Sequence, residues 1–126
     1  MRDLLYVDDL VELMSRACTN IERTVGHVYN VGGGPANTTS VWTELSEPLA
    51  RLIGRTPSVE YAEFRPGDQR VYVSDIRKAQ QHLGWVPKIG LMEGLQRMVE
   101  QLSPMRSIDA QMKPGVDSKA VRAPAR

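Results

Sequence analysis

The stretch that decides the fold is Val28-Tyr29-Asn30-Val31-Gly32-Gly33-Gly34-Pro35. Its first four residues form a short run of mainly strand-forming side chains, which predicts a strand at 28–31. The glycines and the proline that follow predict a tight turn, or a place where the backbone comes close to a ligand. Segments with helical periodicity lie on both sides, and this alternation of strand and helix indicates the α/β class.

Upstream of this stretch, the sequence predicts another strand and then a helix. The apolar run at 4–7 is typical of a strand that is buried on both faces. Asp8 or Asp9 then caps a helix, and Glu12, three residues after Asp9, fits a capping box. The two aspartates could instead form a carboxylate dyad for acid–base chemistry, but capping explains a pair at a helix start better. The helix carries one apolar stripe, formed by Leu10, Leu13, Met14 and Ala17.

Downstream, helices and strands continue to alternate. Ser40 is placed to cap a helix that runs to Ile53 and ends at Gly54, and Pro48 inside it predicts a kink or break. Trp42 and Trp85 are expected to anchor the core. The later expected elements are a strand around 59–61, a turn at 65–68, a strand at 71–73, a helix from Ser74 or Asp75 to Gly84, and a last helix that includes 95–102.

Composition excludes several classes of protein. The chain has 126 residues, enough for one modest core, and its 16 basic and 15 acidic residues argue against a nucleic-acid binder. A single cysteine excludes a disulfide framework, and two histidines without partners at ligand spacing predict no metal site. No stretch is long and apolar enough to span a bilayer, and no signal peptide is visible, so we expect a soluble cytoplasmic protein without a membrane partner.

The last residues differ in composition from the rest. Residues 103–126 contain three prolines, no aromatic residue and no sustained periodicity. Such a stretch buries too little apolar area to offset the cost of ordering its backbone. We therefore expect an ordered body at 1–102 and a disordered tail at 103–126.

The glycine run resembles a dinucleotide-binding loop but fails its spacing. Asn37 stands where the third glycine belongs, and no acidic residue follows at the distance that ribose recognition requires. A tyrosine followed by a lysine four residues later, the spacing suited to proton transfer on one helix face, is also absent; the closest pair is Tyr61 and Arg65. The sequence thus predicts no complete cofactor site and no catalytic residue.

The turn at 65–68 is the most informative polar segment. Arg65 and Arg70 bracket a Pro-Gly bend that also contains Asp68. Guanidinium groups suit phosphate oxygens, and an adjacent carboxylate suits sugar hydroxyls. On spacing alone, a solvated hairpin turn explains these residues better.

Several segments together resemble the extended short-chain dehydrogenase/reductases that act on nucleotide sugars. These are Arg2 to Asp9, Tyr29 to Gly34, Arg65 to Arg70, and Asp75 to Pro87, in that order. The resemblance is to the C-terminal part of an NAD-dependent epimerase/dehydratase, with CDP-paratose (CDP-tyvelose) 2-epimerases nearest. It covers residues 2 to about 102.

The resemblance implies a role for six residues. Arg2 and Arg65 would contact the nucleotide diphosphate, Asp68 would hold the ribose and Tyr72 would line the sugar pocket. Asn30 and Gly32 would bound that pocket near the nicotinamide end of a bound NAD. In such enzymes the N-terminal part supplies the glycine fingerprint and the catalytic tyrosine and lysine, so strand 28–31 would complete a parallel sheet of that part.

The sequence therefore predicts a nucleotide-sugar-binding portion of an NAD-dependent isomerase-type enzyme, truncated and inactive by itself, that binds no NAD alone. Two alternatives remain open. The chain could be a small interaction module that pairs with a separately encoded NAD-binding half, or a gene fragment without function.

Overall fold

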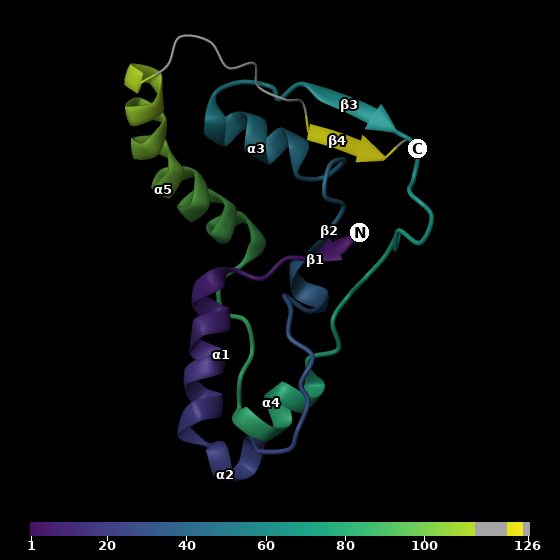
Figure 1. Cartoon of the computed structure of the whole chain (residues 1–126), viewed down its shortest axis with the longest axis vertical. Coiled ribbons are helices and arrows are strands. Elements are labelled where there is room, and N and C mark those ends of the chain that lie inside the picture. Colours follow the sequence, from purple (N-terminus) through teal and green to yellow (C-terminus); the bar gives the residue numbers. More distant parts are fainter. Residues whose placement is uncertain (113–120, 125–126) are drawn as a thin grey trace. The chain divides into compact units, whose positions relative to one another are not determined.

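A computed structural model describes residues 1–112 and 121–124 of the protein (Figure 1). The chain divides into two compact units: unit 1 contains residues 1–40 and 70–94, and unit 2 contains 41–69 and the residues from 95 onward. The predicted ordered body at 1–102 therefore contributes to both units. Unit 1 contains β1 (Arg2–Asp3), α1 (Val7–Thr19), α2 (Ile21–Thr24), a 3-10 turn (Pro35–Asn37), β2 (Thr38–Thr39) and α4 (Arg77–Leu83). Unit 2 contains α3 (Ser46–Ile53), β3 (Val59–Ala62) and β4 (Val121–Pro124), and α5 (Leu91–Met112) begins in unit 1 and continues in unit 2.

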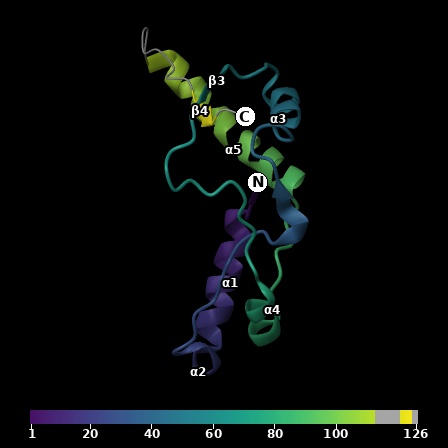
Figure 2. The same ribbon diagram turned by 90° about the vertical axis from the view of Figure 1, so that its right-hand side faces the viewer.

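The core of unit 1 lies between α1 and α4, which run side by side in both views (Figures 1 and 2). Its buried residues are Leu13, Ala79, Leu83 and Trp85. Trp85 is fully buried and its indole Nε1 donates to the carbonyl of Asp9 at 3.0 Å, which confirms the expected anchor. The predicted stripe on α1 is only partly buried, because Met14 remains 60% exposed.

Asp9 does not cap α1. The helix already begins at Val7, so Asp9 lies within its first turn, and the expected capping box is wrong. The Asp9 side chain is buried, and its two oxygens accept the backbone N–H groups of Lys88 at 3.0 Å and Ile89 at 2.9 Å. The carboxylate therefore ties the segment after Trp85 to the helix.

Two expected strands are absent from the described residues, and a third is reduced. Residues 4–6 are irregular before α1 begins at Val7, and residues 28–31 are irregular throughout. The expected strand at 71–73 is reduced to a single bridge, in which Tyr72 pairs with Arg2. A strand forms only where a neighbouring segment pairs with its backbone N–H and C=O groups.

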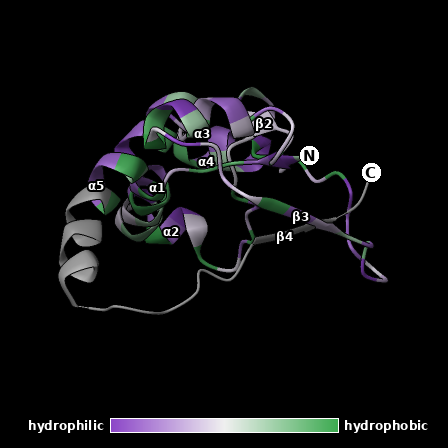
Figure 3. Cartoon of the chain, turned by 90° about the horizontal axis from the view of Figure 1, so that it is seen from above, coloured by the Kyte–Doolittle hydropathy of each residue, from purple (hydrophilic) through white to green (hydrophobic). Residues whose placement is uncertain are grey.

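The sheets of the described chain are small. In unit 1, β1 and β2 are antiparallel, with Arg2 opposite Thr39 and Asp3 opposite Thr38. In unit 2, β3 and β4 are parallel. The architecture is α/β with an incomplete sheet, as the sequence predicts. Figure 3 shows hydrophobic and hydrophilic residues interspersed along the helices, which fits helices with one buried face.

In unit 2, the strand predicted around 59–61 is confirmed by β3, but the predicted helix from Ser40 begins only at Ser46. Pro48 therefore lies in the first turn of α3, where a missing N–H breaks no helical bond, and not in a helix interior, where a kink or break is expected. Gly54 ends the helix in the left-handed conformation, as predicted.

The expected boundary at residue 102 falls inside a helix. α5 continues through Met112, and β4 covers four residues of the expected tail. The rest of that prediction, at 113–120 and 125–126, lies outside the described residues. Among the helices that are described, none combines the length and the apolar character needed to cross a membrane.

Candidate functional site

The two units share the predicted site residues. Unit 1 carries Arg2, Asn30, Gly32 and Tyr72, and unit 2 carries the turn with Arg65 and Asp68.

In unit 1, the backbone brings Arg2 and Tyr72 together although they are far apart in sequence. The two residues form a parallel bridge, and the N–H of Tyr72 donates to the Met1 carbonyl at 3.1 Å. The Arg2 guanidinium donates to the same Met1 carbonyl at 2.8 Å, and the side chain of Tyr72 is exposed. A guanidinium and an aromatic ring on adjacent segments are suited to a phosphate and a sugar.

Asp3 is not among the predicted site residues, but it lies where the segments that carry Arg2, Gly32 and Tyr72 meet. One oxygen of its carboxylate, Oδ2, accepts the N–H of Gly34 and the N–H of Ser74, each at 3.0 Å. Partial burial raises the pKa of Asp3, but the hydrogen bonds from Ser74 and Gly34 outweigh it and lower that pKa below its usual value. No spacing rule identifies this residue, because both of its partners are distant in sequence.

The glycine run is packed against protein atoms. A side chain at Gly32 would overlap the Ser74 hydroxyl and the Asp3 carboxylate, and one at Gly33 would overlap the Leu4 carbonyl. The N–H of Gly34 already donates to Asp3. These glycines make room for close contacts within unit 1, and they do not form a cradle that fits the pyrophosphate of NAD.

In unit 2, residues 65–68 form a closed turn. The N–H of Asp68 donates to the Arg65 carbonyl at 3.1 Å, Gly67 has a φ of 87°, and the Asp68 carboxylate accepts the Arg65 Nε at 3.2 Å. Proline before a glycine with positive φ is typical of a type II turn, so the predicted turn is confirmed. The Arg65 side chain remains 85% exposed.

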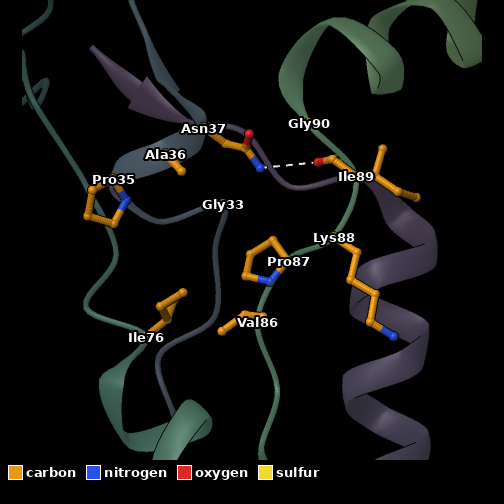
Figure 4. A pocket seen from close by; sticks show the side chains of 10 residues that line it. All are labelled: Gly33, Pro35, Ala36, Asn37, Ile76, Val86, Pro87, Lys88, Ile89 and Gly90. Carbon is orange, nitrogen blue, oxygen red and sulfur yellow. Dashed lines mark hydrogen bonds between the residues drawn. The ribbon is translucent and has the colours of Figure 1, made fainter.

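A pocket of about 340 Å³ lies in unit 1, between the loop at 33–37 and the segment at 86–90 (Figure 4). The amide of Asn37 joins the two segments: Nδ2 donates to the Ile89 carbonyl at 3.2 Å, and Oδ1 accepts the N–H of Leu91 at 3.2 Å. The wall is otherwise mainly apolar, and it includes none of the six predicted site residues. The pocket therefore does not coincide with the predicted site.

The two histidines come together with a tyrosine at the end of α4. The rings of His27 and His82 are 5.3 Å apart between centroids, and Nδ1 of His82 lies 3.2 Å from the Tyr29 hydroxyl. Within the part of the chain that the structure describes, no third histidine, cysteine, aspartate or glutamate joins them in a group that could hold a metal ion. The cluster packs the loop after α2 against α4.

Comparisons with known proteins agree with the motifs. The family described as GDP-mannose 4,6 dehydratase matches residues 1–98. The CDP-paratose 2-epimerase of Salmonella typhi is 31% identical over 103 residues, which are 82% of this chain and 30% of that protein. The UDP-glucuronate 4-epimerase of Thermodesulfobacterium geofontis is 37% identical over 99 residues, which are 78% of this chain and 29% of that protein.

A solved structure leads to the same family. The dTDP-glucose 4,6-dehydratase of Bacillus anthracis, crystallised in complex with NAD, is 27% identical and superposes with a TM-score of 0.66. The match covers 89% of this chain and 34% of that one, so the chain spans about a third of the length of the proteins it resembles. The family match over nearly all of its first hundred residues shows that the chain belongs to the GDP-mannose 4,6 dehydratase family of NAD-dependent epimerases and dehydratases.

Proposed function

We propose that residues 1–102 are the nucleotide-sugar-binding portion of an NAD-dependent epimerase/dehydratase and that a CDP-sugar or a similar nucleotide sugar is the ligand. The observation that carries the proposal is the bridge that places Arg2 beside Tyr72. The family resemblance implies that Arg2 contacts the diphosphate and that Tyr72 lines the sugar pocket. The matched relatives are named for reactions of nucleotide sugars, which supports the same ligand class.

Each residue of the predicted site has a proposed role. Arg2 and Arg65 contact the diphosphate, Asp68 holds the ribose and Tyr72 lines the sugar pocket. Asn30 and Gly32 bound that pocket toward the nicotinamide. The exposed guanidinium of Arg65 supports its role, because only a modest, solvent-screened contact with Asp68 competes with a phosphate.

We also propose that this chain by itself neither binds NAD nor catalyses epimerisation. NAD binding is not expected because atoms of Asp3, Ser74 and Leu4 occupy the space beside the glycines. Catalysis is not expected because the sequence lacks the tyrosine–lysine pair of the family. NAD would supply the hydride acceptor and donor in the whole enzyme, and the residues proposed here would only hold the sugar nucleotide.

Calorimetry with the full chain and CDP or a CDP-sugar tests the binding proposal. Arg65→Ala should weaken binding about tenfold, since one charge-assisted hydrogen bond contributes about 1.5–3 kcal/mol. Arg51→Ala is the matched control, because Arg51 is another highly exposed arginine of unit 2 and it pairs with Glu47 on α3. Absence of binding at millimolar ligand would refute the proposal, and epimerisation of CDP-paratose in the presence of NAD would refute the claim of inactivity.

The second candidate is an interaction module, and the outer face of α1 favours it. Val7, Val11 and Met14 lie on one side of the helix and are 57%, 58% and 60% exposed, whereas Leu13 on another side is buried in the core. A helix that is apolar on two sides is typical of one that packs between two layers. The proposed partner is a separately encoded NAD-binding half, and a chain that binds this half but no CDP would favour this candidate.

A further inference from the structure

We propose that Asp3 is a positioning residue of the nucleotide-sugar site, because it holds the glycine turn and the segment of Tyr72 against the strand that carries Arg2. The inference rests on the proposed function, since it names the residue that keeps the parts of that site in register. It concerns unit 1 only.

Several segments of unit 1 converge on the Asp3 carboxylate. Oδ2 of Asp3 accepts the N–H of Gly34, which ends the glycine run, and the N–H of Ser74, two residues after Tyr72. The Ser74 hydroxyl continues the contact to the Val31 carbonyl at 3.4 Å. One side chain therefore joins three segments that are distant in sequence, namely β1, the glycine turn and residues 72–74.

The Asp3 side chain leaves β1 on the side of the glycine turn. Successive residues of a strand point to opposite faces, so Asp3 and its neighbour Arg2 leave β1 on opposite sides. The carboxylate faces the buried Gly32, Gly34 and Ser74, so the alternation of the strand assigns Arg2 to the opposite side. Asp3 thus stabilises the site from the side of β1 that faces the glycine turn, and it leaves the Arg2 side of the strand, where a phosphate would bind, unoccupied by its own side chain.

The Asp3 carboxylate occupies the space that a side chain at Gly32 would need. A methyl group at Gly32 would overlap both the Asp3 carboxylate and the Ser74 hydroxyl, so the glycine is required by this contact. The absence of a side chain lets the carboxylate reach both N–H groups from one position. The hydrogen bonds also keep the pKa of Asp3 low, so the group is charged at neutral pH and its bonds are charge-assisted.

The chemistry of the two bonds provides a sharp pair of variants. Both N–H groups donate to the same oxygen, and the amide oxygen of an asparagine can accept both in the same place. Asp3→Asn should therefore keep the geometry and lose the charge, whereas Asp3→Ala loses both bonds. Asp75→Asn is the matched control, because the Asp75 carboxylate is exposed and bonds Arg77 on its own segment.

The test combines two measurements on the full chain at a temperature well below its melting point. Amide hydrogen exchange at Gly34 and Ser74 reports the positioning itself, and calorimetry with CDP reports its effect on the site. In Asp3→Ala, both amides should lose protection and CDP should bind about tenfold more weakly. In Asp3→Asn the protection should persist and binding should fall by no more than about threefold, and Asp75→Asn should change neither readout.

The outcomes separate the two proposals. Unchanged protection of both amides in Asp3→Ala would overturn the positioning role, whatever the affinity for CDP. Lost protection with unchanged CDP affinity would overturn the link between Asp3 and the site and leave the proposed function intact. If the unmodified chain binds no CDP, the proposed function fails, and the role inferred for Asp3 in it falls as well.

Discussion

The buried carboxylate of Asp9 offers the sharpest test of what holds unit 1 together. Oδ1 accepts the Lys88 N–H at 3.0 Å and Oδ2 accepts the Ile89 N–H at 2.9 Å, so each oxygen has its own donor. Asp9→Asn should be severely destabilising, because the amide NH2 would face one of these N–H groups with no acceptor between them. The asparagine oxygen can still accept one N–H, so the variant loses one hydrogen bond to a charged group, about 1.5–3 kcal/mol, and leaves a buried N–H without an acceptor, about 1–3 kcal/mol more. The unfolding free energy should therefore fall by about 2.5–6 kcal/mol.

Urea unfolding followed by tryptophan fluorescence measures this loss. Trp85 is fully buried and its indole donates to the Asp9 carbonyl, so its emission reports directly on the affected region. Trp42→Phe removes the other tryptophan, which lies in unit 2. Asp8→Asn is the control: this aspartate is exposed in the first turn of α1, and it should cost at most about 1 kcal/mol through the helix dipole. A loss below 1 kcal/mol for Asp9→Asn would refute the reasoning.

Three further predictions concern packing and pH. Gly33→Ala should reduce the unfolding free energy by more than about 2 kcal/mol, because the added methyl would overlap the Leu4 backbone. Gly90→Ala adds a methyl in open space, so it should change the unfolding free energy by no more than about 0.5 kcal/mol. Urea titrations of the two variants measure the difference. Leu13→Ala should cost about 2–5 kcal/mol and Met14→Ala less than about 1 kcal/mol in the same assay, since only the former empties a buried site; equal losses would contradict this assignment of the two faces. The Arg77 guanidinium beside Asp75 lowers the pKa of that carboxyl from 3.8 to about 2. The pair therefore stabilises the fold above the unfolded pKa, and this contribution disappears as the pH falls toward 2. Thermal melts across this pH range should show a flatter dependence of the melting temperature on pH in Asp75→Asn.

Local signals in the sequence were sufficient where the structure depends on neighbouring residues. Gly54 and Gly84 each end a helix with positive φ, and the Pro-Gly bend before Asp68 forms the turn that its composition predicts. Both tryptophans are predicted to anchor the core, and this is confirmed for Trp85, whereas Trp42 is only partly buried. Each of these features is set by one residue and its immediate surroundings.

Long-range contacts explain what the sequence could not predict. Asp9 fits the spacing of a capping box, but its actual partners, Lys88 and Ile89, are distant in sequence and invisible to any local pattern. The predicted strand at 28–31 has the right composition, yet a strand requires a paired neighbour, and in the described residues this stretch has none. Composition thus gives the tendency of a segment, and the available partners determine its final structure.

The glycine run shows how one sequence pattern can have two physical causes. Glycines after a strand-like segment suggest a loop that lets a phosphate approach the backbone, and the same residues are needed wherever two protein segments come into close contact. In unit 1 the approaching groups are the Leu4 carbonyl, the Asp3 carboxylate and the Ser74 hydroxyl. Because these protein atoms fill the space beside Gly32 and Gly33, the glycine run serves to assemble the segments around Asp3. We therefore expect the proposed nucleotide sugar to contact the side chains that this assembly positions, and not the glycines themselves.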